Sequence, residues 1–260
     1  MSNINILHIC SYFNTSTLYI NLMHALKSNG DVKQSVFIPM YKNQKLVDDY
    51  GTVRNFFKEE QDISFDYSYF LDNWERYFLK HRIKKSFKVL EKQYCFKDYN
   101  FVHAHSLLFN GGIAYNVYRR YKINYITAVR MTDFEVLKKA PLYKSFALAI
   151  MKNAKKVVFI SESLKMKFFS LFRKSEVEGV SCVVIPNGIN DYWYNVKTTF
   201  KTKFRKEEIN FLYQGTLHKR KNIEYTIRIV ETLNDCGYNV FLKIVGGGPE
   251  KENIKKIIEQ

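Results

Sequence analysis

Residues 209–250 begin with INFLYQGTLHKRKN (209–222) and end with NVFLKIVGGGPE (239–250). Each stretch is a short apolar run followed by a glycine turn, and apolar residues at helical spacing lie between them. This order predicts a strand, a helix, a second strand and a second helix. Helix N-termini bind anions, and the three cations at 219–221 add positive charge there. The stretch therefore predicts a phosphate-binding corner, with a lysine-rich surface turn as the alternative.

A unit of the same kind begins the chain. Ile4–Cys10 is an apolar run that is typical of a buried parallel strand, and apolar residues recur at helical spacing over 18–26. Gly30 is suited to end that helix, and Lys33–Pro39 predicts the next strand. Because the two units match in period, we expect two parallel-sheet domains.

The residues between these units predict further strands, at Phe101–Ala104, Tyr125–Val129, Lys156–Ile160 and Cys182–Ile185. Strands that alternate with helices indicate an α/β fold with an open parallel sheet. We expect a complete N-terminal Rossmann-like domain over 1–187, an interdomain linker over 188–208 and a partial C-terminal Rossmann-like domain over 209–260. The last range is about half of what a doubly wound domain needs.

The chain is strongly basic, with a net charge of +16 over 260 residues. Such a surface attracts nucleic acid, anionic lipid or phosphorylated substrates, although a lysine-rich codon bias would produce part of the charge without function. No aromatic-basic RNA motif or helix-turn-helix spacing is present, so nucleic acid is not an expected partner. The basic amphipathic stretches 76–92 and 138–156 indicate either peripheral contact with an anionic membrane or ordinary solvated helices.

The sequence also bears on location. It contains no apolar run of about 18 residues and no pattern of a signal peptide. Its four cysteines form no CxxC pair, which argues against a zinc site or a disulfide framework. We expect a cytoplasmic protein that is either free or peripheral on the inner face of the cell membrane.

Polar residues at predicted strand ends are the candidates for chemistry in the first domain. His103 and His105 alternate onto one face; His105 is the better cleft candidate, and a buried, hydrogen-bonded ring is the alternative for His103. A third metal ligand is not evident, so we expect no metal. Arg130 is suited to clamp a phosphate, whereas Asp133 either accepts a hydrogen bond from a hydroxyl group or caps the next helix.

Two other classes of site are not supported. The turn after the first strand lacks GxGxxG, and the glycines at 246–248 lack a third glycine in register, which argues against a nicotinamide-dependent dehydrogenase. No Ser–His–Asp or Cys–His arrangement of a nucleophile is evident.

Six landmarks occur in order along the chain: FVHAH (101–105), YITAVRMTD (125–133), VVFISESL (157–164), IPNGI (185–189), GTLHKRKN (215–222) and VGGGPE (245–250). Together they resemble glycosyltransferase family 4, which has the GT-B fold. The resemblance implies retaining, metal-independent transfer of a sugar from a nucleotide-sugar donor, without a cofactor. It implies a donor site on the C-terminal domain and a lipid-linked or polysaccharide acceptor on the N-terminal one.

The resemblance also assigns residues. Lys221 and Gly215 match the lysine and the turn glycine at the donor diphosphate, and Thr216 stands where the family often has an arginine that Lys219 or Arg220 would replace. The expected substrate-binding residues are Gly215, Thr216, Arg220, Lys221, Gly247 and Gly248, with Asn14 and Ser16 in the loop after the first strand. The expected catalytic residues are His105, Arg130 and Asp133.

Some features depart from the family pattern. Arg130 replaces the usual histidine, as in a bacterial envelope-polysaccharide branch with an Arg-x-Thr-Asp pattern. The family's paired-glutamate motif, which grips the ribose and the sugar, would lie beyond Gln260. We therefore expect a truncated enzyme with impaired activity, or alternatively a non-catalytic acceptor- or membrane-binding remnant.

Overall fold

The computed structural model describes residues 4–13, 18–28, 30–44, 63–189, 195 and 208–259. The chain forms two compact units, residues 1–194 and 195–260, called unit 1 and unit 2 below. Most of the expected linker over 188–208 lies outside the described residues. Each unit is described separately.

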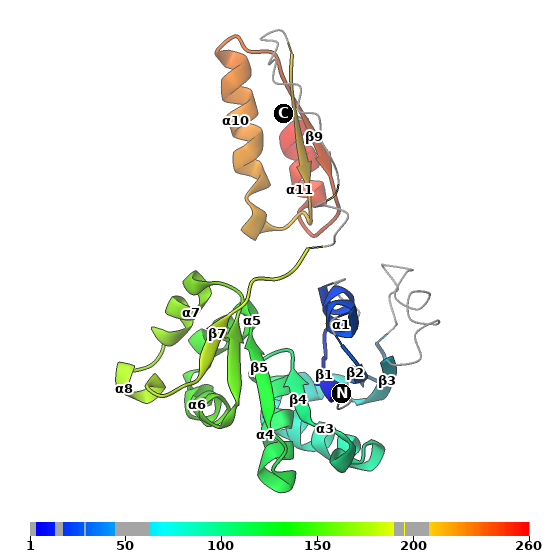
Figure 1. Ribbon diagram of the computed structural model, residues 1–260. Coiled ribbons are helices and arrows are strands. Elements are labelled where there is room, and N and C mark those ends of the chain that lie inside the picture. The colour runs from blue at the N-terminus through cyan, green and yellow to red at the C-terminus, as the bar shows by residue number, and fades with distance from the viewer. Residues whose placement is uncertain are drawn as a thin grey trace. The chain divides into compact units, whose positions relative to one another are not determined.

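Unit 1 contains a seven-stranded sheet in the order β3-β2-β1-β4-β5-β6-β7 (Figure 1). All neighbouring strands are parallel. The strand order reverses between β1 and β4, so this pair marks the topological switch point of the sheet. The predicted α/β, Rossmann-like architecture is confirmed. The strands are β1 (Ile4–Ile9), β2 (Val32–Tyr41), β3 (Ile63–Leu71), β4 (Phe101–Ala104), β5 (Tyr125–Val129), β6 (Lys156–Phe159) and β7 (Cys182–Val184).

Helices cover both faces of this sheet. On one face Met23 packs with Val36 and Ile38, and on the other Ile113 and Ile150 belong to the larger apolar core. None of the described helices is both long and apolar enough to cross a bilayer. The helices of unit 1 are α1 (Leu18–Ser28), α3 (Leu79–Gln93), α4 (Phe109–Tyr121), α5 (Met131–Lys139), α6 (Lys144–Asn153), α7 (Glu162–Phe169) and α8 (Lys174–Val177), with short 3-10 turns η2 (Asn73–Tyr77), η3 (Phe96–Asp98) and η4 (Pro141–Tyr143).

Helix α3 begins later than its amphipathic pattern predicts. The pattern begins at Arg76, but that residue lies in η2, which is closed by a buried Glu75. The Glu75 carboxylate accepts a hydrogen bond from the Asp72 N–H at 2.6 Å and pairs with Lys85 at 2.9 Å. These bonds hold the chain in a tighter turn just before α3 starts at Leu79.

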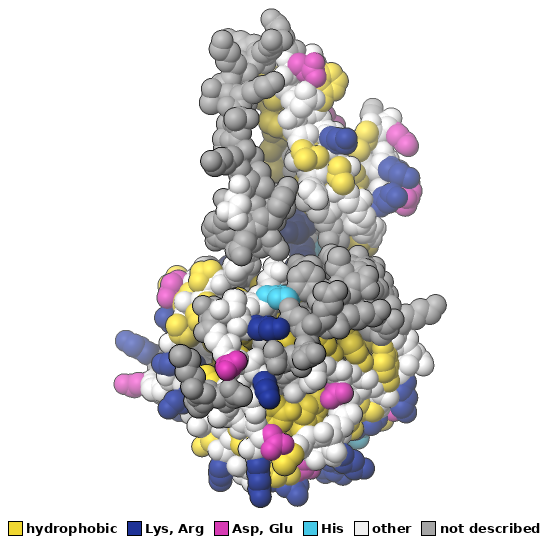
Figure 2. Space-filling model, turned by 45° about the vertical axis from the view of Figure 1, so that its right-hand side comes forward, with side chains coloured by type: hydrophobic (Ala, Val, Ile, Leu, Met, Phe, Trp, Pro, Cys, Tyr) yellow, Lys and Arg dark blue, Asp and Glu magenta, His cyan; other side chains and the backbone are white. Residues whose placement is uncertain are grey.

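Basic side chains are spread over the surface of unit 1. In the view of Figure 2, lysine and arginine side chains lie around the margin of this unit and also singly near its centre, beside apolar side chains. The positive charge is therefore not gathered into one patch on the face shown.

Unit 2 contains a parallel pair of strands, β8 (Ile209–Gln214) and β9 (Val240–Val245), in register from end to end. The 3-10 turn η5 (Lys219–Lys221) leads into α10 (Ile223–Asp235), and α11 (Lys251–Ile258) follows β9. Leu217, Ile223, Ile227 and Ile254 form the small core. The opposite sheet face carries Leu212 and Phe241, which are 65% and 53% exposed.

Candidate functional site

A cavity of about 470 Å³ lies at the carboxyl ends of the strands of unit 1. Its lining comes from segments that follow β1, β4 and β5, together with the ends of β2 and β3 and the start of α3. This is the edge at which open α/β sheets bind ligands, close to the topological switch point. Lining residues include Ser11, Tyr12, Tyr41, Leu71, Arg76, Arg82, Ser106, Leu108, Phe109, Thr132 and Asp133.

Asp133 joins the loops after β4 and β5. Its carboxylate accepts hydrogen bonds from the backbone N–H groups of Arg130 at 2.9 Å, Leu108 at 3.0 Å and Leu107 at 3.2 Å. Burial raises the pKa of Asp133, against the lowering effects of these donors and of the Arg130 charge. Asp133 thus caps the start of α5, which is one of the two roles predicted for it, since its carboxylate accepts a hydrogen bond from the Arg130 N–H. Asp133 also lines the cavity, so its role toward a substrate stays a prediction.

The Arg130 guanidinium is held by two contacts. Nε donates to the carbonyl oxygen of His105 at 3.2 Å, and Nη1 donates to Oδ1 of Asn187 at 3.3 Å. Because a guanidinium carries five N–H donors, donors remain for an anionic group. The structure thus joins the predicted residues Arg130, Asp133 and His105 through backbone and side-chain hydrogen bonds.

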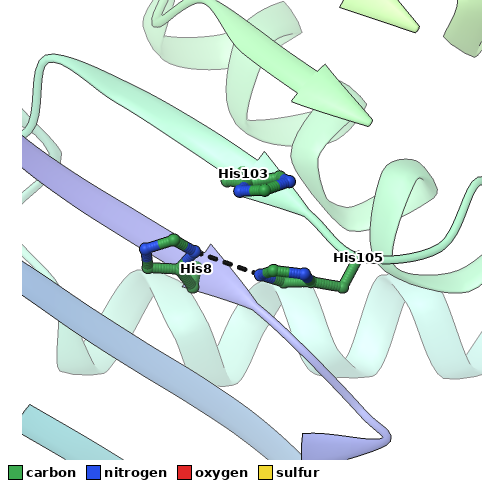
Figure 3. Close-up of side chains that lie close together, drawn as sticks. All are labelled: His8, His103 and His105. Carbon is green, nitrogen blue, oxygen red and sulfur yellow. Dashed lines mark hydrogen bonds between the residues drawn. The ribbon is translucent and has the colours of Figure 1, made fainter. Parts of the chain in front are cut away.

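The His105 ring is placed differently from the expectation that it faces a cleft. It is only 1% exposed, and its Nε2 lies 3.1 Å from Nδ1 of His8 (Figure 3). His103, expected to be the buried ring, keeps part of its surface exposed but is largely desolvated. Contact between the His105 ring and a substrate therefore remains a prediction without support from its position.

His8 completes a cluster that sequence reasoning missed. Its strand, β1, pairs with β4 so that His8 lies directly beside His103. Burial lowers the pKa of all three rings, to about 4 for His103 and well below the ordinary range for His8 and His105. The rings are therefore neutral at physiological pH. The sequence did show His8 near the end of a predicted strand. Its place beside His103 could be inferred only if the pairing of β1 with β4 were known.

The cavity wall formed by η2 and α3 was also missed. Arg82 donates from Nη1 to the Tyr41 hydroxyl at 2.7 Å and lies 4.3 Å over the ring of Phe109. Arg76 lies 4.6 Å over the Tyr41 ring. The sequence placed both arginines on a solvated or membrane-facing helix surface, whereas the structure places them at the cavity, where they can receive an anionic group.

In unit 2, the two glycine turns contact each other. A Cβ atom on Gly246 would overlap the carbonyl oxygen of Gly215, and one on Gly248 would overlap the carbonyl oxygen of Leu217. Leu217 N–H donates to the Gly247 carbonyl oxygen at 2.8 Å. The predicted residues Gly215, Gly247 and Gly248 are thus brought together, and Gly246, which was not predicted, is required for the contact.

The three cations of η5 are exposed beside these turns. His218 caps η5, because its Nδ1 accepts a hydrogen bond from Arg220 N–H at 3.4 Å. Within the described part of the chain, Lys219, Arg220 and Lys221 have no acidic partner. Thr216 lies in the same turn and accepts through its carbonyl oxygen from the Tyr213 hydroxyl at 3.3 Å. The predicted residues Asn14 and Ser16 lie outside the described residues.

Solved structures with the same fold include nucleotide-sugar enzymes. A glycosyltransferase from Rickettsia africae aligns over 99% of this chain and 72% of its own, with 14% identity and a TM-score of 0.53. Anabaena HepE, solved with UDP and glucose, aligns over 98% of this chain and 65% of its own, with 12% identity and a TM-score of 0.53. The fold of the chain is therefore α/β of the GT-B type.

A fold alone does not define a reaction. A Listeria monocytogenes protein assigned as a UDP-N-acetylglucosamine 2-epimerase aligns over 95% of this chain and 63% of its own, with 12% identity and a TM-score of 0.50. No curated protein matches the sequence.

The family model of glycosyl transferases group 1 matches residues 196–260. This range contains both glycine turns and the three cations of η5. The match supports glycosyl transfer and lies on the corner that the sequence singles out.

Proposed function

We propose that the protein is a retaining glycosyltransferase that moves a sugar from a nucleotide-sugar donor to a lipid-linked or polysaccharide acceptor in bacterial envelope glycan synthesis. No metal ion takes part in the transfer step. The observation that carries this proposal is the paired glycine turn with its three cations, inside the segment that matches glycosyl transferases group 1.

Unit 2 is the proposed donor site. The diphosphate of a nucleotide sugar gains negative charge as its bond to the sugar breaks, and fixed cations lower the barrier to that step. Lys219, Arg220 and Lys221 supply these cations, while the glycines of the two turns let backbone N–H groups approach the phosphates.

Unit 1 is the proposed acceptor site. Arg76 and Arg82 line its cavity beside Tyr41 and Phe109, so the wall combines guanidinium groups with aromatic rings. Such a wall suits an acceptor that carries a phosphate or carboxylate next to a sugar or an apolar chain. Arg130, which keeps free donors near the same sheet edge, is proposed to stabilise charge during transfer.

A surface next to this cavity favours contact with a membrane. Trp74, Tyr77 and Phe78 are 54%, 83% and 56% exposed, and the Trp74 ring lies 5.7 Å from that of Phe78. Exposed lysines of α3 follow at Lys80, Lys84 and Lys88. Aromatic rings beside lysines are typical of surfaces that bind anionic lipid bilayers. We place the protein at the cytoplasmic face of the cell membrane, where lipid-linked acceptors would reach the cavity.

Two assays test the proposal. A panel of nucleotide sugars is incubated with the full chain and lipid-linked acceptors, and sugar incorporation and release of the nucleoside diphosphate are measured. Binding to vesicles of phosphatidylglycerol is measured by sedimentation for the wild type and for Trp74→Ala/Tyr77→Ala, with Tyr238→Ala, also an exposed tyrosine, as the control.

The outcomes separate two functions. Sugar transfer supports the enzyme. Vesicle binding that requires Trp74 and Tyr77, without transfer from any donor and without donor binding, would support a non-catalytic membrane- or acceptor-binding module, which the exposed aromatic surface also favours. If neither sugar transfer nor vesicle binding is observed, both the enzyme and the non-catalytic module are contradicted.

A further inference from the structure

Three of the six histidines of the chain gather at one place in unit 1. His8 and His103 lie side by side on β1 and β4, and His105 follows two residues later on the same face. Figure 3 shows the three rings together where the two strands end. They meet at the switch point of the sheet, where both strands approach the cavity edge.

The spacing of the rings suits a metal ion. One nitrogen from each ring lies within 4.8 Å of the other two. Nδ1 of His8 and Nε2 of His105 are 3.1 Å apart, and two imidazole ligands of a tetrahedral zinc ion are separated by about 3.3 Å. The nitrogens of His8 and His105 therefore already have the spacing of two zinc ligands, whereas the His103 nitrogen, which lies within 4.8 Å of both, would have to move closer.

The rings are also in the state that binds metal. Neutral imidazole is the ligand form of histidine, and His8 and His105 are almost completely buried, which disfavours their protonation. Among the described residues, Nε2 of His8 and Nδ1 of His105 are buried without a hydrogen-bond partner. Leaving such atoms unpaired costs stability, and metal binding through the other nitrogens would offset this cost.

Gln34 provides support behind the cluster. Its side-chain nitrogen donates to the Met23 carbonyl oxygen at 3.0 Å, which fixes the amide and leaves Oε1 buried without a partner in the described structure. The Gln34 side chain lies close enough to His8 to raise its pKa, against the effect of burial. A small ring rotation would join Nε2–H of His8 to Oε1, which would direct Nδ1 of His8 toward the metal.

We propose that His8, His103 and His105 form a zinc site that ties β1 to β4, with water in the fourth position. The role is structural, and it is independent of the proposed sugar transfer, which uses no metal. The expectation of no metal site rested on the lack of a third ligand, and His8 supplies it. Arg130 is close enough to act on His103 and His105 electrostatically, so its charge opposes zinc and limits the affinity.

The test uses the untagged full chain after dialysis against a chelator. Zinc is titrated against a competing indicator, and bound metal is counted after desalting. We expect one zinc per chain and, at zinc about 100-fold above Kd, a rise in Tm on the order of 5 °C or more. Cobalt in place of zinc should give the intense visible bands of a tetrahedral site.

Variants assign the ligands. His8→Gln and His103→Gln should each lose stoichiometric zinc and the Tm rise, while His218→Gln, which removes a histidine of unit 2, should retain both. Arg130→Gln should tighten zinc binding severalfold.

Three outcomes would overturn the proposal: no stoichiometric zinc in the wild type, an octahedral cobalt spectrum, or zinc binding unchanged in His8→Gln. Should a histidine variant fail to fold, the titration and cobalt spectrum of the wild type decide the question alone.

Discussion

Nη1 of Arg130 donates a hydrogen bond to Oδ1 of Asn187 at 3.3 Å, so the residue that follows β5 is joined to the segment after β7. The same guanidinium holds the carbonyl oxygen of His105 through Nε. Segments that follow three strands of one sheet are thereby fixed around one cation. This arrangement orients the remaining N–H donors of Arg130 before any substrate is bound, and such preorganisation is what makes a fixed cation effective in catalysis.

Replacing Arg130 by lysine should lower the rate of sugar transfer by about 100-fold, because lysine keeps the charge but loses the planar fork of donors. Asn187→Ala removes only one of the two anchors, so its loss should be smaller. Both rates are measured relative to the wild type with the same donor, with Tm as a control for folding. Equal rates in Arg130→Lys and the wild type would remove Arg130 from the catalytic step.

The glycines at 246–248 provide a matched pair of substitutions. Gly248→Ala places a Cβ atom against the Leu217 carbonyl oxygen, whereas no atom lies within 4 Å of a Cβ at Gly247. We expect Gly248→Ala to open unit 2, seen as faster hydrogen exchange of the β8 and β9 amides. Gly247→Ala should leave exchange unchanged and weaken donor binding alone. Similar exchange in the two variants would contradict the observed packing of the turns.

The histidine cluster should make unit 1 sensitive to acid. The folded state holds His8, His103 and His105 at lowered pKa values, so the unfolded chain binds more protons than the folded chain below about pH 6.5. The contribution of the neutral rings to the stability of unit 1 is therefore fully present above that pH. This contribution is lost as the pH falls toward about 4, the pKa of His103. The loss from His103 is on the order of 3 kcal/mol.

Urea denaturation in the presence of a chelator measures this dependence. His103→Gln should reduce the slope of the stability profile between pH 7 and pH 4 without removing it, because His8 and His105 remain, while His218→Gln should leave the slope unchanged. A wild-type protein that gains stability over this range as the pH falls would show that the rings are not buried in the neutral form.

Asp133 should be a structural as well as a functional residue. Asp133→Ala removes the acceptor of three backbone N–H groups and leaves them buried, which we expect to destabilise unit 1 by about 2–3 kcal/mol. Asp133→Asn keeps one acceptor oxygen and should cost less. Chemical denaturation of both variants checks the order, and the opposite order would mean that the carboxylate is not the cap.

The parts of the fold that could be predicted are those in which one local pattern suffices. The strand Tyr125–Val129 has the predicted bounds, because buried parallel strands are continuous apolar runs. The order of strand, turn and helix around 215 and 246–248 was equally readable, since glycine turns after apolar runs mark the ends of strands. By contrast, β3 was not predicted, because ISFDYSYFL mixes polar and aromatic residues and forms the edge of the sheet.

The parts of the site that were missed depend on which elements are neighbours. His8 joins His103 and His105 only because β1 pairs with β4, nearly 100 residues later in the chain. Arg76 and Arg82 reach the cavity because of the way η2 and α3 pack beside β2 and α4, and the helical pattern alone suits a solvated or membrane-facing surface equally well. Sequence periodicity gives a face of a helix, but it does not identify what that face meets.

Binding of UDP to the full chain tests the central claim most directly. Calorimetric titration should show binding that weakens with salt, falls by about 10-fold or more in Lys221→Gln, and is unchanged in Lys243→Gln, which removes an equal charge from an exposed position of β9. Absence of binding to UDP and to other nucleoside diphosphates, or an equal loss in the two lysine variants, would contradict a donor site at the glycine corner.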